Sequence, residues 1–292
     1  MELVLDVKDE MQSSTATSFL QDGEPTYQLQ RQASEPSDTL LHGVGHLAAE
    51  SGMAKSAFRS SDDATTLPFL VPANAMAVVE LRRTTTIVQA LIGDGVSISS
   101  EFSGSYLNGL VDDMTSMAYT INAGIQKYGI GVHPLTGTKQ YTYEVDGHGN
   151  MYYADDANVP SLLSLPYLGY VNATDPIYIN TRNFVLSSNN PWYFSGKAGA
   201  GLGGPHVGLN SIWPMSIIIQ ALTSTDSEEI TNCVELLVDS TENTGLMHES
   251  FNKDDVGSYT RPWFAWANSL FGELVLKLYD EGLERIKITS EQ

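Results

Sequence analysis

The chain has 292 residues, and 42% of them are hydrophobic, which is enough apolar material for a sizeable buried core. It carries 35 acidic and 15 basic residues, and the net charge of −20 argues against binding to nucleic acid or to anionic membranes. The single cysteine, Cys233, excludes an intrachain disulfide, and its amphipathic surroundings indicate a buried apolar role. We find no apolar run of membrane-spanning length and no signal-peptide pattern at the start.

The first half of the chain predicts two long helices and a hairpin. Residues 1–40 are polar and are expected to form a surface segment with one short amphipathic helix. Dense apolar positions predict a largely buried helix over residues 68–91, and a second helix is expected over 106–128. Alternating aromatic side chains flank an Asp-Gly pair between residues 140 and 152, which predicts a β-hairpin.

The second half of the chain predicts more helices, separated by long loops. A Thr225-x-x-Glu228 pattern matches a capping box, so a helix is expected to begin there. A long loop with a glycine-rich run is expected over residues 187–208. The expected helices begin after Asp156 and cover residues 175–186, 210–222, 225–239 and 262–286. Strands are few, and this pattern favours stacked helical hairpins over a doubly wound sheet.

Asp155 and Asp156 are the most informative pair of acidic residues. They precede a segment that reads as a helix start, where Asp156 or Asn158 can serve as the cap and Pro160 fits the first turn. From the dipeptide alone, a cap and a general acid are equally good interpretations. Nearby aromatic residues leave little room for bulk water and favour the acid. These residues are Tyr152, Tyr153, Tyr167 and Tyr170.

Glu249 is the best candidate for a second carboxylate, if the site binds a sugar. It follows His248 in what reads as a loop between two helices, where a lone glutamate is ordinarily solvated. Tryptophans are more often core residues than ligand platforms. Trp213 and Trp263, however, lie beside prolines at helix starts, and their side chains are expected to face a cavity lined by loops.

No metal or cofactor is expected. The six histidines are scattered without metal-ligand spacing, and the glycine-rich run near Lys197 lacks the ending of a phosphate-binding loop. The acidic pairs at 62–63 and 155–156 leave calcium as a minority interpretation, since no EF-hand loop is present.

Four segments together resemble glycoside hydrolase family 125, a family of exo-acting α-1,6-mannosidases. These segments are residues 58–64, 155–163, 247–251 and 261–269, and the resemblance extends over most of the chain. It implies an (α/α)6 toroid with the active site at one mouth, inverting hydrolysis without a metal, an aspartate acid and a glutamate base. Its expected partner is an α-1,6-linked mannose glycan.

The resemblance assigns roles to particular residues. The acid falls on the Asp155–Asp156 pair and the base on Glu249; we favour Asp155 as the acid, which leaves Asp156 to cap the helix. Inversion needs about 6.5–9.5 Å between the two carboxyl groups, and burial among tyrosines is expected to raise the pKa of the acid. The implied sugar-binding residues are Arg59, Asp62, Asp63, His206, Trp213, Arg261, Trp263 and Asn268.

The chain also departs from that family. Family members carry an N-terminal portion with a Trp-Leu-Arg-Asp-type motif, which this sequence lacks. We therefore expect an all-α fold, a toroid incomplete at its N-terminus with a small β-hairpin insertion. Residues 1–40 would form the polar segment with a helix from the truncated barrel, and residues 41–292 the catalytic domain. Alternatives are an inactive paralogue, a carbohydrate-binding remnant of the same fold, and an inverting hydrolase with another glycan preference.

Overall fold

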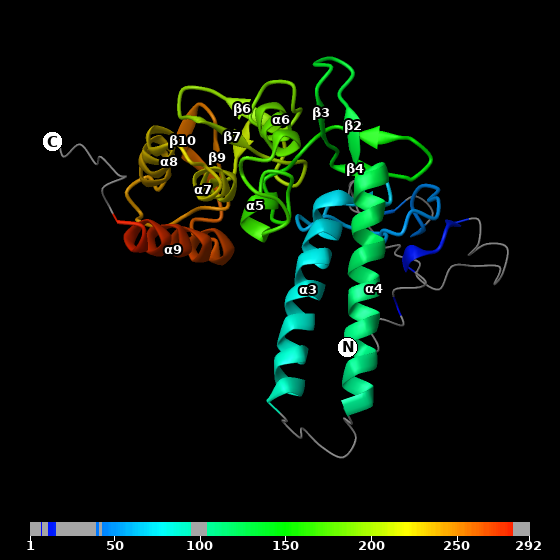
Figure 1. The fold of residues 1–292 in the computed structure, drawn as a ribbon. Helices are drawn as coiled ribbons and strands as arrows, with labels where there is room; N and C mark the ends of the chain where they lie inside the picture. Colours follow the sequence, from blue (N-terminus) through cyan, green and yellow to red (C-terminus); the bar gives the residue numbers. More distant parts are fainter. Residues whose placement is uncertain (1–6, 8–10, 16–38, 41–42, 95–103, 283–292) are drawn as a thin grey trace. The chain divides into compact units, whose positions relative to one another are not determined.

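The computed structural model describes residues 7, 11–15, 39–40, 43–94 and 104–282 (Figure 1). These residues fall into two compact units, and each is described by itself. The first unit comprises Met1–Arg59, Asp63–Tyr152 and Leu168–Tyr170, and the second comprises Ser60–Asp62, Tyr153–Tyr167 and Val171–Gln292. Most of the expected polar segment over residues 1–40 lies outside the described residues.

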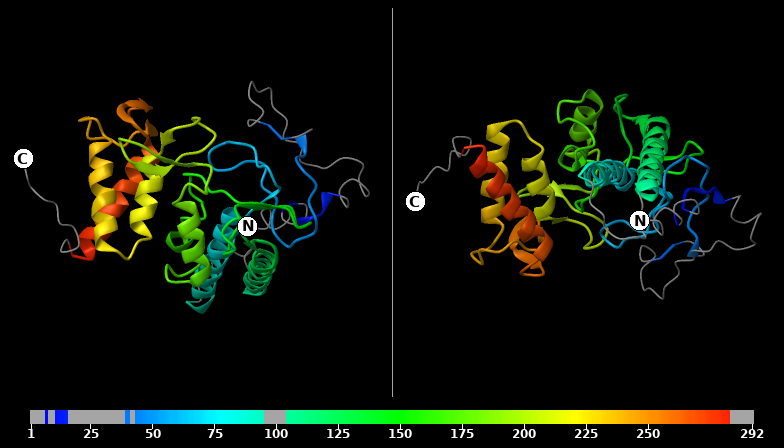
Figure 2. Two further views of the ribbon diagram at one scale, coloured as in Figure 1. Left: turned by 90° about the horizontal axis from the view of Figure 1, so that it is seen from above. Right: turned by 60° about the horizontal axis from the view of Figure 1, so that its bottom comes forward.

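Two long helices dominate the first unit, as the sequence predicts. They are α3 (Val71–Gly93) and α4 (Gly104–Tyr128), which pack side by side in Figures 1 and 2. A proline in the first turn suits the start of α3, because its missing N–H would have no partner within the helix. Val78 on α3 and Met114 on α4 are fully buried, which places the core of this unit along the helix pair.

Small antiparallel sheets accompany this helical pair. The predicted hairpin is confirmed, because β4 and β5 pair across the Asp-Gly turn, and Asp146 Oδ1 accepts hydrogen bonds from the N–H groups of His148 and Asn150. The strands of the first unit are β1 (Phe69–Leu70), β2 (Ile130–Val132), β3 (Lys139–Tyr141), β4 (Glu144–Val145) and β5 (Met151–Tyr152). They form the sheet β1-β4-β5 and the pair β2-β3.

The second unit is built around α7, which is apolar on nearly every side and almost entirely buried. Both α8 and α9 pack against it. The helices of the second unit are α5 (Leu165–Leu168), α6 (Pro176–Val185), α7 (Pro214–Leu222), α8 (Ser227–Asp239) and α9 (Ala265–Asp280). Because α7 is covered from several directions, it forms the core that carries the surrounding loops.

Two further small sheets lie in the second unit. The strands are β6 (Tyr193–Ser195), β7 (Ala200–Leu202), β8 (Ser211–Ile212), β9 (Ser250–Asn252) and β10 (Asp255–Thr260). β6 pairs with β7, and β9 lies between β8 and β10. The β9–β10 register is regular next to Glu249 and shifts between Asp255 and Tyr259, where β10 bulges.

Several boundaries differ from the sequence prediction. The described chain is helical with four small sheets, so it is not plainly all-α, and the loop expected over residues 187–208 contains the β6–β7 hairpin. α7 begins at Pro214 because Ser211 and Ile212 pair with β9. The capping box was wrong: Asp226, not Thr225, caps α8 by accepting from the N–H of Glu228. The last helix is described only to Asp280, and residues from 283 on lie outside the described range.

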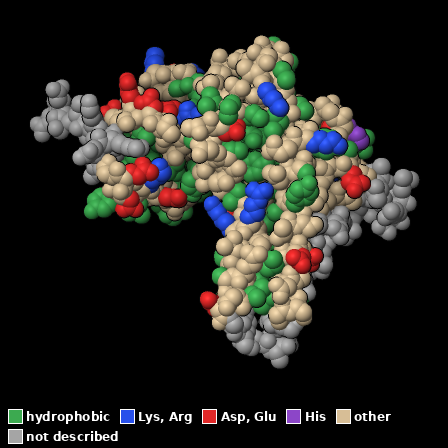
Figure 3. Space-filling view, viewed as in Figure 1, with side chains coloured by type: hydrophobic (Ala, Val, Ile, Leu, Met, Phe, Trp, Pro, Cys, Tyr) green, Lys and Arg blue, Asp and Glu red, His purple; other side chains and the backbone are tan. Residues whose placement is uncertain are grey.

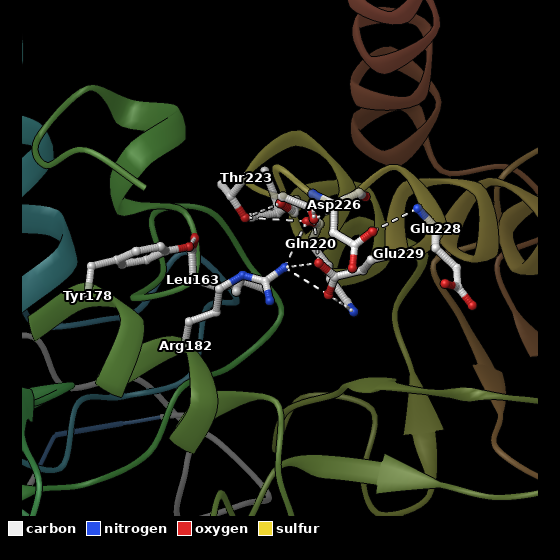
Figure 4. Close-up of polar contacts among 10 residues, drawn as sticks. Leu163, Tyr178, Arg182, Gln220, Thr223, Asp226, Glu228 and Glu229 are labelled. Carbon is white, nitrogen blue, oxygen red and sulfur yellow. Dashed lines mark hydrogen bonds and ion pairs between the residues drawn. The ribbon is translucent and has the colours of Figure 1, made fainter. Parts of the chain in front are cut away.

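A polar cluster ties α6 to α7 and α8 inside the second unit (Figure 4). Arg182 on α6 reaches both carboxylate oxygens of Glu229 at 2.9 Å and the backbone oxygen of Gln220 at 3.2 Å. Gln220 and Ser224 also donate to the Glu229 carboxylate. Burial alone would raise the pKa of Glu229, but these donors and the Arg182 charge together lower it.

The surface reflects the acidic composition. On the face drawn in Figure 3, carboxylates gather over α8 and α9, which agrees with the excess of acidic residues in the sequence. None of the helices in the described part of the chain is both long and apolar enough to cross a lipid bilayer.

Candidate active site

Asp155 is a fully buried carboxylate that organises the turn before α5. Its Oδ1 and Oδ2 accept hydrogen bonds from the N–H groups of Leu162 and Leu163 at 2.8 and 2.9 Å. The Asn190 side chain forms two hydrogen bonds with the Asp155 backbone. Its Oδ1 accepts from the Asp155 N–H, and its Nδ2 donates to the Asp155 backbone oxygen. Burial raises the pKa of Asp155 well above its usual value, while the two backbone N–H groups oppose that rise.

The expected division of labour between the two aspartates was therefore wrong in one respect. Asp155, not Asp156, satisfies the N–H groups of the short turn leading into α5. A second bond holds the same turn, because Tyr178 on α6 donates its hydroxyl to the Leu163 oxygen (Figure 4). The helix itself has four residues and begins at Leu165, later than the expected start with Pro160 in the first turn. Sequence alone does not distinguish the two aspartates, because both precede the same turn.

Asp156 lies against a glycine-rich backbone. It is fully buried, and its Oδ1 accepts from the N–H of Asn158 at 2.9 Å. The next residue along the chain, Ala157, donates its N–H to the oxygen of Gly203. A Cβ on Gly204 would lie 3.4 Å from the Asp156 Cβ, and a Cβ on Gly203 would collide with the Ser211 backbone oxygen. The close approach of the Ser211 backbone therefore requires a glycine at 203, whereas a side chain at 204 would meet Asp156 at an ordinary van der Waals distance.

The rings of His206, Trp213 and Phe264 lie close together and form what we call the aromatic wall. Trp213, the N-cap residue of α7, is buried, and its ring meets Phe264 edge-on at 5.8 Å between centroids. The exposed His206 lies 6.3 Å from the same indole. Trp213 Nε1 is buried and has no hydrogen-bond partner among the described residues. An indole N–H in that position is suited to a ligand hydroxyl, because a buried donor without a partner is costly.

Glu249 lies at the other end of this wall. Its carboxylate is nearly buried, and Oε1 is 3.2 Å from Nε of Arg261, whose guanidinium lies 5.7 Å from the Phe264 ring centre. Arg261 is exposed and has a positive φ of 41°, a backbone strain common at functional sites. Glu249 directly precedes β9, so the loop expected between two helices contains a strand pair as well.

The backbone around Glu249 is fixed by its neighbours. Asn268 on α9 accepts from the Met247 N–H at 3.0 Å and donates to the Met247 oxygen at 2.8 Å. His248 is fully buried, stacks on Tyr259 at 3.8 Å between ring centres, and its Nδ1 lies 2.8 Å from the Pro262 oxygen. His248 was not among the predicted site residues. Its adjacency to Glu249 was the available signal, but a lone histidine carries little weight.

The remaining predicted residues have diverse surroundings. In the first unit, the buried Arg59 pairs with Glu144 at 2.7 Å, with its guanidinium near Tyr143 and Tyr152, and Asp63 is buried. In the second unit, Asp62 is exposed and Trp263 is 58% exposed. That Trp263 faces a cavity stays a prediction. Asn268 makes its described side-chain bonds to backbone atoms.

Chain neighbours and contacts together connect the acidic pair to Glu249 within the second unit. Ala157, which follows Asp156, donates its N–H to the Gly203 oxygen, and His206 follows Gly203 closely in the chain. The His206 ring lies 6.3 Å from Trp213, Trp213 meets Phe264, and Phe264 lies near Arg261, the ion-pair partner of Glu249. No three His, Cys, Asp or Glu side chains within the described ranges are grouped as metal ligands. A separate hollow of about 540 Å³ between α7 and α8 is lined by Gln220, Glu229 and Cys233, among others, and by none of the predicted site residues.

Comparison with known proteins identifies relatives over most of the chain. The family described as metal-independent alpha-mannosidase (GH125) matches residues 1–276. The meiotically up-regulated gene 157 protein of Schizosaccharomyces pombe is 48% identical over 260 residues, which are 88% of this chain and 48% of that protein.

A solved structure from Streptococcus pneumoniae is also similar. It belongs to a study of metal-independent alpha mannosidases and is a non-productive complex with α-1,6-mannobiose. The match has a TM-score of 0.83 and 37% identity, and it covers 96% of this chain and 63% of that one. The chain therefore spans about half the length of the curated relative and under two thirds of the solved one.

Proposed function

The chain belongs to glycoside hydrolase family 125, the metal-independent α-mannosidases, and on this premise we propose that it supplies the catalytic residues of an exo-acting, inverting α-1,6-mannosidase. The observation that carries the proposal is that Asp156 and Glu249 are both buried in the same unit, which also holds the rings of Trp213 and Phe264 between their two segments in the series above. The linkage is supported by the α-1,6-mannobiose with which the similar bacterial protein forms its complex. Paired carboxylates on a wall of aromatic side chains suit cleavage of a neutral sugar.

We assign the general acid to Asp156. Asp155 uses both carboxylate oxygens to hold the turn before α5, which makes it a structural anchor. Asp156 is its neighbour in the chain, and its described hydrogen bond engages one carboxylate oxygen, from the N–H of Asn158. This assignment replaces the expectation that Asp155 is the acid. Glu249 remains the general base.

The proposed reaction breaks one bond and forms one. The bond from C1 to the glycosidic oxygen breaks, and its electron pair stays on that oxygen, which takes the proton of Asp156. Water attacks C1 from the opposite face and gives its proton to Glu249. We expect about 6.5–9.5 Å between the two carboxyl groups, the spacing that admits this water. The released mannose is then the β anomer, and exchange with solvent restores both protonation states.

Further roles complete the proposal. Of the sugar-binding residues that the resemblance implies, we propose that those of the second unit bind the glycan: Asp62, His206, Trp213, Arg261 and Trp263. The helix pairs α3–α4 and α7–α8 are proposed to be hairpins of an (α/α)6 toroid. We propose that residues 41–292 belong to that catalytic domain.

Two substrates separate the carboxylate roles. An aryl α-mannoside with a nitrophenolate leaving group needs no proton at departure, whereas α-1,6-mannobiose does. Asp156→Asn should reduce turnover of mannobiose about 10²- to 10⁴-fold and that of the aryl mannoside far less. Glu249→Gln should reduce both alike, because both need an activated water. Proton NMR of the first product should show β-mannose.

Asp155→Asn serves as the matched control for Asp156→Asn. Its new amide N–H would face a backbone N–H, so we expect lower stability with little dependence on the leaving group. If Asp155→Asn, and not Asp156→Asn, lost activity mainly on mannobiose, the acid role would return to Asp155.

If the wild-type protein binds mannobiose with no turnover on either substrate, the binding-remnant alternative replaces the enzyme. Metal independence predicts unchanged activity after dialysis against a chelator, and loss restored by a divalent ion would contradict it.

A further inference from the structure

Two buried side chains, one beside each proposed catalytic carboxylate, have nitrogen atoms with no hydrogen-bond partner among the described residues. They are Asn158 Nδ2 and His248 Nε2, and both side chains lie in the second unit. Asn158 is 1% exposed and His248 is 0% exposed. Buried polar atoms are nearly always paired in native proteins, because an unpaired one costs desolvation energy. Such atoms next to proposed catalytic groups therefore point to a ligand.

The position of Asn158 is fixed through Asp156. The Asn158 backbone N–H donates to Asp156 Oδ1 at 2.9 Å, so the two side chains belong to one tight turn. The side-chain Nδ2 carries two N–H groups and can only donate. It therefore suits the oxygen of a sugar hydroxyl close to the bond that Asp156 is proposed to protonate.

The position of His248 is fixed by contacts on two sides. The ring stacks on Tyr259 with an interplanar angle of 7°, and Nδ1 lies 2.8 Å from the Pro262 oxygen. That oxygen can only accept, so Nδ1 carries the proton and donates. In the neutral ring, Nε2 then offers a lone pair, which suits the hydrogen of a hydroxyl group.

We propose that Asn158 and His248 bind hydroxyl groups of the terminal mannose, the first as a donor and the second as an acceptor. This inference rests on the proposed function and names two contacts beyond the predicted sugar-binding set. A pyranose ring presents several hydroxyls that both donate and accept, so one uncharged ligand satisfies both nitrogens. Because the two residues flank the acid and the base, they recognise the sugar that is released and are indifferent to the leaving group.

The test uses substitutions that separate the two edges of the imidazole. His248→Asn keeps an amide N–H near the position of Nδ1, able to donate to Pro262, and removes the polar atom at Nε2. His248→Gln places an amide group near Nε2. Asn158→Leu keeps similar volume without the donor. Gln140→Met is the matched control, because Gln140 is also fully buried, with an unpartnered Nε2 among the described residues, in the first unit.

Asn158→Leu and His248→Asn should lower kcat/KM about 10- to 100-fold, by the same factor on α-1,6-mannobiose and on the aryl mannoside. His248→Gln should recover part of that loss, and Gln140→Met should retain wild-type kcat/KM. A panel of singly deoxygenated mannosides adds a readout that a purely structural role would not move. In the wild-type protein, removing a hydroxyl that is bound should lower kcat/KM. His248→Asn should no longer respond to removal of one particular hydroxyl, and Asn158→Leu should no longer respond to removal of a different one.

The outcomes distinguish failure of this inference from failure of the proposed function. Wild-type activity together with unchanged kcat/KM in both variants would overturn this inference and leave the proposed function standing. Unchanged deoxy-sugar discrimination in variants of reduced activity would also overturn it, because the loss would then come from altered folding. A wild-type protein that neither binds nor cleaves mannosides would remove the proposed function and this inference with it.

Discussion

Asn268→Ala tests whether Asn268 holds the Glu249 segment or touches the sugar. The Asn268 side chain accepts one hydrogen bond from Met247 and donates one each to the oxygens of Met247 and Phe264, at 2.8–3.0 Å. Each such bond contributes about 1 kcal/mol net, so the loss of all three should lower the free energy of unfolding by about 3 kcal/mol. For a protein of this size, that is a fall in melting temperature of roughly 6–12 °C.

The same substitution has a specific kinetic consequence. Met247 lies two residues before Glu249, so a loosened backbone should misplace the base and lower kcat while KM stays near the wild-type value. Urea unfolding and steady-state kinetics below the melting temperature measure the two effects. The control is Asn108→Ala, because exposed Asn108 makes one bond within α4 and its loss should be nearly neutral. Wild-type stability with a raised KM alone would refute the reasoning and restore Asn268 to the sugar-binding set.

Two further predictions concern ion pairs. Arg59→Met should destabilise the protein by about 3–5 kcal/mol in thermal unfolding, because it leaves the buried Glu144 carboxylate without its cation. Adding Glu144→Gln should recover part of that loss. A wild-type melting temperature in Arg59→Met would contradict this prediction. The pKa of Glu229 is lowered on folding, so the charged carboxylate stabilises the folded state. This stabilisation is fully present above the unfolded pKa near 4.5 and is lost as the pH falls through the folded pKa. Glu229→Gln should therefore cost about 1 kcal/mol at pH 7 and progressively less in acid, and a cost independent of pH would argue against the pair with Arg182.

Local patterns in the sequence predicted much of the backbone. The helices over residues 68–91 and 106–128 match α3 and α4 because long apolar periodicity needs no knowledge of distant partners. The hairpin at residues 140–152 was predictable for the same reason, since its turn and its strands are adjacent. By contrast, β8 is a two-residue strand that exists through pairing with β9, about forty residues away, and no local pattern reveals it.

The site was predictable as a set of segments more than as a set of roles. Asp155, Asp156 and Glu249 all lie on buried segments of the second unit, where residue type and the family resemblance placed the chemistry. Which aspartate anchors a turn depends on the direction of two N–H groups, and this is a property of the folded backbone. Likewise, an asparagine at position 268 reads as a ligand contact until its backbone partners are known.

The β9–β10 pairing limits where the chain can change length. Two residue pairs, Thr260 with Ser250 and Tyr259 with Phe251, align the strands next to Glu249, and the bulge lies on the far side of them. Adding one residue between Glu249 and this pairing would turn the following side chains to the opposite face of the sheet. Insertions at residues 256–258 would instead be absorbed by the bulge. Natural length variation, and any peptide tag inserted into this hairpin, should therefore be tolerated at the bulge and excluded from the residues next to Glu249.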